Sequence, residues 1–170
     1  DVYTFTGATI SKLVIPSSVD TVDAYAFENA TVDSISFAPD SKCKTFDDYA
    51  FLGSNIKSIV IPKSVEKINI SAFSKSTVNK VTFENGSKVK VLSDGTFSNC
   101  ENLESVDFGK NNSLAIIESD VFENTKIKNL DLSGCVNLVS LQSLPSANTL
   151  ESIDLSNTKI RRIPDFFFNG

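Results

Sequence analysis

Hydrophobic positions recur along this chain with a period of 22 to 25 residues. A phenylalanine marks each period, and an apolar triplet spaced i, i+3, i+5 begins five or six residues after it. The marker residues are Phe5, Phe27, Phe51, Phe73, Phe97, Phe122 and Phe168, with Ser146 in the place of one missing phenylalanine. A fixed period in this range predicts a solenoid, in which each repeat buries its apolar side chains against the next one.

Each repeat is expected to hold one short strand and one tight turn. The last two triplet members alternate with mostly polar positions, which predicts a half-buried strand. The triplets are Ile10-Leu13-Ile15, Val32-Ile35-Phe37, Ile56-Ile59-Ile61, Val78-Val81-Phe83, Leu103-Val106-Phe108, Ile127-Leu130-Leu132 and Leu150-Ile153-Leu155. A second apolar anchor precedes the phenylalanine by five residues, and a polar residue suited to a helix N-cap follows the anchor. The anchors are Val22, Phe46, Ile68, Leu92, Ile117 and Ile163, and the segment after each is expected to form one or two turns of 3₁₀ or α helix.

Two phrases of the repeat resemble a known family. Residues 13–19 read LVIPSSV and residues 22–27 read VDAYAF, and the pattern returns as IVIPKSV at 59–65 with AF at 72–73. These phrases resemble the BspA-like subfamily of leucine-rich repeats, and the resemblance covers the whole chain. Residues 130–135 (LDLSGC) and 153–158 (IDLSNT) resemble the more general leucine-rich repeat. Repeats two, four and five depart from the pattern through longer loops, and repeat six lacks its phenylalanine.

The period and the resemblance together predict an α/β fold. We expect a right-handed leucine-rich-repeat solenoid of about seven repeats of 22–25 residues, with a parallel concave sheet and short 3₁₀ or α turns on the convex side. Residues 1–170 are expected to form a single leucine-rich-repeat domain. Both ends stop at the same point of the repeat, which suggests a segment of a longer array without its caps. Uncapped repeats at Phe5 and Phe168 would expose apolar faces and predict end-to-end self-association.

Composition narrows the class of function. The net charge of −5 and the pI of about 4.7 argue against binding to nucleic acid or to anionic lipid. No apolar run approaches the roughly 18 residues that span a bilayer, so we expect no direct membrane insertion in this segment.

The residues that most catalytic and metal sites need are absent or scattered. The chain has no histidine, which removes Ser-His-Asp and Cys-His nucleophilic sites and the commonest zinc ligand. Its seven glycines form no phosphate-binding loop. We therefore predict no enzymatic activity, no cofactor and no metal site. Cys100 and Cys135 fall in columns of small residues and are expected to be packed, whereas Cys43 falls in a variable loop and is a candidate free thiol.

The outward-pointing strand positions are the best candidates for binding. A ligand-binding surface on the concave face is predicted at Lys57, Val60, Lys80, Thr82, Glu104, Asp107, Lys128, Asp131 and Asp154. In this register Asp107, Asp131 and Asp154 stack about 5 Å apart. This ladder either binds a cation or a basic protein segment, or is solvated and hydrogen-bonded locally. A calcium site would need about six or more oxygens in a compact loop, and the chain has no acidic loop of that kind.

The function that the resemblance implies is adhesion. Members of the family look like cell-surface or secreted proteins of mucosal bacteria and protozoan parasites, which adhere to host matrix proteins or to other microbes. We therefore expect a non-enzymatic recognition module that binds a protein ligand, from the extracellular matrix or a host surface, through the concave sheet. The alternative is a structural spacer that projects other domains and has no binding site of its own. A glycan-binding module is a weaker third candidate, because the concave columns offer no aromatic residue to stack on a sugar.

Overall fold

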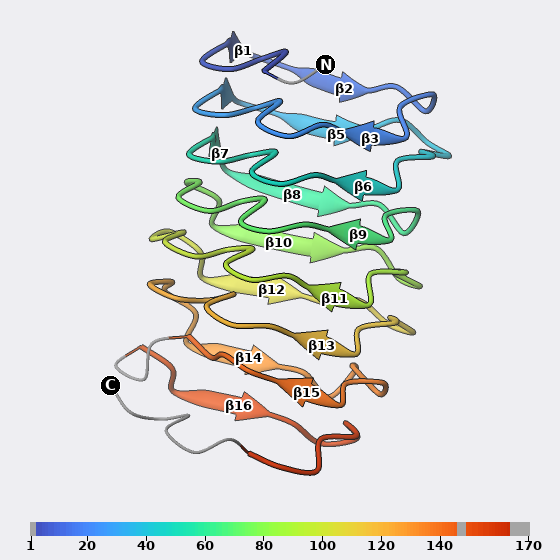
Figure 1. The fold of residues 1–170 in the computed structure, drawn as a ribbon, viewed down its shortest axis with the longest axis vertical. Helices are drawn as coiled ribbons and strands as arrows, with labels where there is room; N and C mark the ends of the chain where they lie inside the picture. The colour runs from blue at the N-terminus through green and yellow to red at the C-terminus, as the bar shows by residue number, and fades with distance from the viewer. Residues whose placement is uncertain (1–2, 146–148, 164–170) are drawn as a thin grey trace.

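The computed structural model describes residues 3–145 and 149–163, and these form a stack of short parallel strands (Figure 1). The main strands are β2 (Leu13–Ile15), β5 (Ile35–Phe37), β8 (Ser58–Ile61), β10 (Lys80–Phe83), β12 (Ser105–Asp107), β14 (Asn129–Asp131) and β16 (Ser152–Asp154). A second column holds β3 (Thr21–Val22), β6 (Thr45–Phe46), β9 (Lys67–Ile68), β11 (Val91–Leu92), β13 (Ile116–Ile117) and β15 (Ser140–Leu141). A third, short column holds β1 (Thr9–Ile10), β4 (Thr31–Val32) and β7 (Asn55–Ile56).

Parallel pairing between successive coils builds a leucine-rich-repeat-like solenoid of about six turns. The second column is one continuous six-stranded sheet in the order β15-β13-β11-β9-β6-β3. The chain advances by one coil per repeat along a single axis (Figure 1). The predicted parallel solenoid is therefore confirmed. The expected count of about seven repeats is not, since β16 begins a further turn whose marker residue, Phe168, lies outside the described residues.

The described residues contain no helix, so the expected 3₁₀ or α turns are not confirmed. Between anchor and phenylalanine, the amides alternate between two kinds of partner. In the second coil, Ala26 and Glu28 donate their N–H groups to carbonyls three residues back. Phe27 and Asn29 donate to carbonyls of the next coil instead. An α helix would need each of these donors for its own i→i−4 bonds, so inter-coil bonding takes the place of a helix. No described helix is long and apolar enough to cross a membrane.

Left-handed backbone at two points of each turn also excludes a helix. Tyr25 and Asn29 have φ of 56° and 52°, and Gly95 and Asn99 in a later coil have φ of 62° and 57°. A residue in this region cannot continue a right-handed helix. The column two residues after the phenylalanine contains Gly7, Asn29, Gly53, Lys75, Asn99 and Asn124. Glycine and asparagine in this column predict a turn at this position, and the prediction of a helix did not take them into account.

The marker phenylalanines form a continuous spine through the core. Ring centroids of successive members are 5.1, 5.1, 4.7, 5.3 and 6.2 Å apart from Phe5 to Phe122, and every pair is stacked. Phe51, Phe73 and Phe97 are fully buried. The prediction that these residues are core is confirmed over the described part of the chain, because each coil covers the ring of its neighbour.

All three cysteines are free and buried. Burial raises the pKa of each thiol to about 11. This confirms that Cys100 and Cys135 are packed small residues. Cys43 differs from the expectation, because it lies in a core column with Val65 and Val89 rather than in a variable part of the loop.

Candidate functional site

The outward-pointing side chains of β2, β5, β8, β10, β12, β14 and β16, with those of the exposed residues that lie one or two positions before each strand, form the surface that we call the main-sheet face. Strand register confirms the predicted columns: Thr82 pairs with Val60 on one side and Asp107 on the other. Asp131 pairs with Asp154, and Lys80 pairs with serines of both neighbouring strands.

The structure places the predicted site residues together on this face. Lys57, Glu104 and Lys128 directly precede β8, β12 and β14, and all three are exposed. Of the nine predicted residues, Thr82 is half-buried and the other eight are exposed. The main-sheet face is therefore fully accessible to a partner, and the binding role of these residues stays a prediction.

Each aspartate of the ladder is bonded to its own loop. Oδ1 of Asp107 accepts the N–H of Gly109 at 2.9 Å, and Oδ1 of Asp154 accepts the N–H of Ser156 at 2.8 Å. Oδ1 of Asp131 accepts both the N–H and the hydroxyl of Ser133. Hydrogen bonds from Ser156 lower the pKa of Asp154 below its usual value. Within the described ranges, no group of three or more acidic or cysteine side chains is placed to hold a metal ion.

A lysine partly offsets the acidic end of the main-sheet face. Nζ of Lys128 lies 2.8 Å from Oε1 of Glu151, one coil away, and the two side chains are 65% and 62% exposed. The hydrogen bond to Glu151 raises the pKa of Lys128. Because both groups are exposed, this pair is a weak contact that a charged partner can displace.

The main strands are not one continuous sheet. Ladders join β2 to β5, β10 to both β8 and β12, and β14 to β16. In the second and fourth coils the residue after the main strand, Ala38 or Glu84, donates its N–H to the previous coil. Pro62 stands at this position in the third coil and has no N–H. The carbonyl of Phe37 therefore lacks the inter-coil donor that the carbonyls of Ile15 and Ile61 have, at the point where the ladder between β5 and β8 is interrupted.

A hollow of about 560 Å³ opens beside this interruption. We call it the Val60 notch and define it by Ala38, Pro39, Val60, Pro62, Lys63 and Glu84, which are among its lining residues. The side chain of Val60 is 52% exposed. The register of the repeat predicts that Val60 points outward on this face, but it does not predict the hollow.

Charge changes along the main-sheet face. The coils of β2 to β10 carry Lys12, Lys57 and Lys80 against Asp33. The coils of β12 to β16 carry Glu104, Asp107, Asp131, Glu151 and Asp154 against Lys128. The face is thus basic and partly apolar at one end and acidic at the other. A partner whose acidic residues meet the basic end and whose basic residues meet the acidic end would match it.

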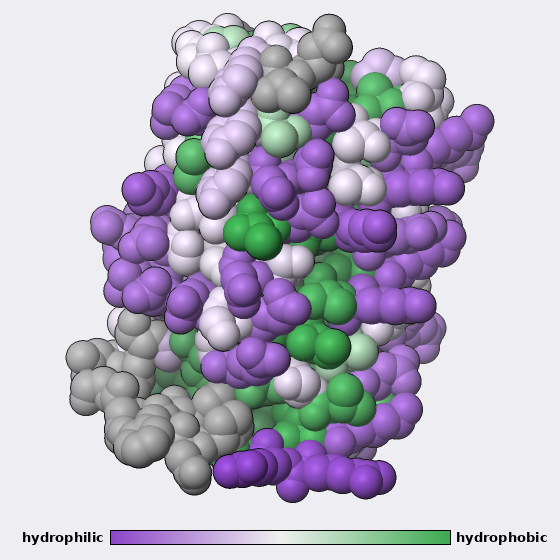
Figure 2. Space-filling model, in the orientation of Figure 1, coloured by the Kyte–Doolittle hydropathy of each residue, from purple (hydrophilic) through white to green (hydrophobic). Residues whose placement is uncertain are grey.

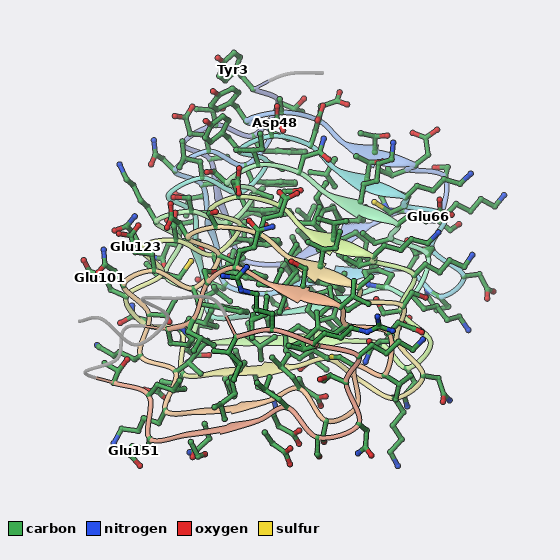
Figure 3. All side chains as sticks on the ribbon, turned by 60° about the horizontal axis from the view of Figure 1, so that its bottom comes forward. Tyr3, Asp48, Glu66, Glu101, Glu123 and Glu151 are labelled. Atoms are coloured by element: carbon green, nitrogen blue, oxygen red, sulfur yellow. The ribbon has the colours of Figure 1, made fainter. Side chains whose placement is uncertain are left out.

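The turns carry aromatic residues, which the main-sheet face lacks. Tyr3, Tyr25 and Tyr49 stack with ring centroids 5.2 and 5.1 Å apart. Figure 3 shows Tyr3 at one edge of the molecule and Asp48 beneath it. Because the rings cover one another, the inner ring faces are not free to stack on a sugar. All three tyrosines have left-handed backbone, with φ of 64°, 56° and 58°. The sequence pattern did not predict that their rings stack.

The second column of strands presents a further apolar surface. Figure 2 shows hydrophobic side chains gathered over β11, β13 and β15. Val91 and Ile116 are half-buried at outward positions there, and Val139 is 52% exposed. At the N-terminal end of the stack, a hollow of about 270 Å³ is lined by Phe5, Leu13 and Val19.

Comparison with known proteins supports a repeat family. A family model described as the BspA type leucine rich repeat region matches residues 1–90 and 78–170, with six copies. No curated protein sequence matches the chain.

Two solved structures resemble the fold. The crystal structure of the pneumococcal vaccine antigen PcpA has a TM-score of 0.53 at 17% identity and covers 86% of this chain and 31% of that chain. A leucine-rich repeat protein from Bacteroides ovatus has a TM-score of 0.47 at 25% identity and covers 92% of this chain and 44% of that chain. The chain spans less than half the length of either structure, and the first likeness shows a shared fold.

Proposed function

Since the chain belongs to the BspA type leucine-rich repeat family, we propose that it is a recognition module that binds a protein ligand through the main-sheet face. The module belongs to a cell-surface or secreted protein, and its ligand is an extracellular matrix protein or a protein on a host cell or another microbe. Repeats of this family occur in surface or secreted proteins, and this supports the location. The role is non-enzymatic, as is general for leucine-rich-repeat solenoids.

The observation that carries the proposal is the composition of the main-sheet face. Register fixes which side chains point outward, and these positions change from lysine and valine at β8 and β10 to aspartate at β12, β14 and β16. A spacer needs only a uniformly polar surface. A face whose charge changes sign along its length favours specific recognition over the spacer alternative.

The test is binding of the chain to a panel of immobilised matrix and plasma proteins. The site variant combines Lys80→Gln, Asp107→Asn and Asp131→Asn. Asparagine keeps the oxygen that accepts the local N–H of Gly109 or Ser133, so this variant removes charge without removing the strand-end bond. We expect saturable binding by the original chain and a loss of about tenfold or more in the variant.

The matched control changes the same numbers of basic and acidic groups on the turns. It combines Lys75→Gln, Glu101→Gln and Glu123→Gln, three exposed positions, and Figure 3 shows Glu101 and Glu123 close to each other at one edge of the molecule. Binding that survives in the control but not in the site variant would support the main-sheet face. Equal loss in both variants, or no binding by the folded chain, would favour the spacer alternative.

A further inference from the structure

Unequal loop lengths shape the surface next to β8. Three residues separate Ile61 from Val65 in the third coil. In the coils on either side, five residues separate Phe37 from Cys43 and Phe83 from Val89. Because successive loops stack directly on one another, a short loop between two longer ones leaves a depression. The Val60 notch occupies this place, with Pro62 and Lys63 of the short loop between Pro39 and Glu84 of the longer ones.

Backbone bonding keeps the notch open. Pro62 cannot donate to Phe37, and β5 and β8 lie next to each other without a ladder at the position where the notch lies. Oε2 of Glu84 accepts the N–H of Lys63 at 2.9 Å and fixes the short loop against the following coil. The hydroxyl of Ser64, which also lines the notch, is buried and has no hydrogen-bond partner.

The chemistry of the notch selects an uncharged side chain. Ala38, Pro39, Val60 and Pro62 supply apolar carbon. The charged residues that line it are two of each sign, namely Asp40, Lys63, Glu84 and Lys88. A balanced rim gives no net attraction for a charged group, while exposed apolar carbon gains from covering by another apolar group. Beyond the notch, the main-sheet face becomes acidic at Asp107, Asp131 and Asp154.

We propose that the Val60 notch receives one bulky apolar side chain of an extended polypeptide, whose Lys or Arg residues then lie along Asp107, Asp131 and Asp154. This rests on the proposed function and names the chemistry of the partner segment. Main strands are spaced by roughly 4.8 Å, so Asp107 lies about 10 Å and Asp154 about 19 Å from Val60 along the stack. An extended chain advances roughly 3.3 Å per residue, which places the basic residues about three to six positions from the apolar one.

The test uses fluorescent synthetic peptides in which one leucine lies about three and about six residues from two arginines, in a serine and threonine background. One companion peptide replaces leucine with serine and another replaces both arginines with glutamine. We expect the complete peptide to bind about tenfold more tightly than either companion, as measured by fluorescence anisotropy at low salt. Raising the salt should weaken the arginine contribution and leave the leucine contribution nearly unchanged.

Variants of the chain assign each contribution. Val60→Ser should weaken the complete peptide about tenfold and leave the leucine-free peptide unchanged. Val14→Ser is the matched control, because Val14 lies in the same outward column with 46% exposure but does not line the notch. Asp131→Asn should weaken only peptides that contain arginine, and Asp33→Asn, an equal change of charge at the other end of the face, should have a smaller effect. Val60→Thr is a second notch variant, since Thr82 shows that the column accepts threonine.

Equal binding of the leucine and serine peptides would overturn the proposal, as would equal effects of Val60→Ser and Val14→Ser or no binding of any peptide. Suppose that a protein from the matrix panel binds the original chain, Val60→Ser and Val60→Thr equally well and fails to bind the variant with changes at Lys80, Asp107 and Asp131. In that case the proposed function stands and the notch assignment fails. If Val60→Ser instead abolishes self-association in sedimentation, a second copy of this chain occupies the notch and the polypeptide assignment fails.

Discussion

Phe73 shows what a single residue of the spine contributes. Its ring is fully buried and stacks on Phe51 and Phe97 with centroids 4.7 and 5.3 Å away. We expect Phe73→Ala to lower the free energy of unfolding by about 3–5 kcal/mol, because it removes the ring and leaves a cavity that neighbouring coils cannot fill. Phe73→Leu should cost less. Urea unfolding followed by circular dichroism measures both.

The end of the spine provides the control for that prediction. Phe5 is only half-buried and stacks on a single described neighbour, Phe27. Phe5→Ala should therefore cost clearly less than Phe73→Ala. Equal losses at the two positions would mean that stacking between coils is not what stabilises the spine.

The three thiols are a second residue-scale test. Burial raises the pKa of Cys43, Cys100 and Cys135 to about 11. The thiolate is the reactive form, so at pH 8 only about one thiol in a thousand is ionised. We expect almost no labelling of the folded chain by a thiol reagent at pH 8, a rate that rises towards pH 11, and full labelling of all three in denaturant.

The labelling rate of Cys43 distinguishes the exposed loop position expected from the sequence from the buried position in the structure. If it lay in an exposed variable loop, one thiol per chain would react rapidly at pH 8 under native conditions. A Cys43→Ser variant identifies that thiol. Slow labelling of all three residues would support the core column, whereas one fast thiol that disappears in Cys43→Ser would contradict it.

At the scale of the element, the strands were predictable and the turns were not. Alternation in the apolar triplets selects the main strands, since inward and outward positions must differ in a half-buried strand. The anchor-to-phenylalanine segment has a spacing that also suits a short helix. Inter-coil hydrogen bonds decide the outcome, and local spacing does not contain them. Tyr25, Tyr49 and Ser71 adopt left-handed backbone although none is glycine or asparagine, so these three positions carried no local signal for a turn.

Lys75 tests the left-handed backbone directly. It has φ of 60° in a column that otherwise contains glycine or asparagine. Lys75→Asn should raise the free energy of unfolding by roughly 0.5–1 kcal/mol, because asparagine tolerates this backbone better than lysine. Lys63→Asn, at a second exposed lysine that has no positive φ, is the control. No difference between the two variants in chemical denaturation would show that the turn stores no such strain.

At the scale of the whole molecule, the sequence predicted which residues share a face but not the shape of that face. Repeat spacing sets the columns, so the sequence alone predicts that Val60, Thr82 and Asp107 lie side by side. The Val60 notch depends on the difference in length between neighbouring loops and on the missing N–H of Pro62. Those features are visible in the sequence only when three consecutive repeats are compared with one another. The tyrosine stack likewise requires the coil spacing.

The N-terminal end of the stack predicts how whole chains associate. Its hollow is lined by Phe5, Leu13 and Val19, and the side chain of Tyr3, close to Phe5 in the sequence, is 56% exposed. In every later described coil the preceding coil covers the corresponding residues, so this end carries apolar surface that a second chain can bury. We expect the sedimentation coefficient of the 170-residue chain to rise with concentration. Leu13→Lys should keep the chain monomeric, whereas Ile70→Lys, which changes an exposed apolar residue in the third turn, should associate like the original. A single monomeric species at the highest concentration, or equal effects of the two variants, would exclude association through this end.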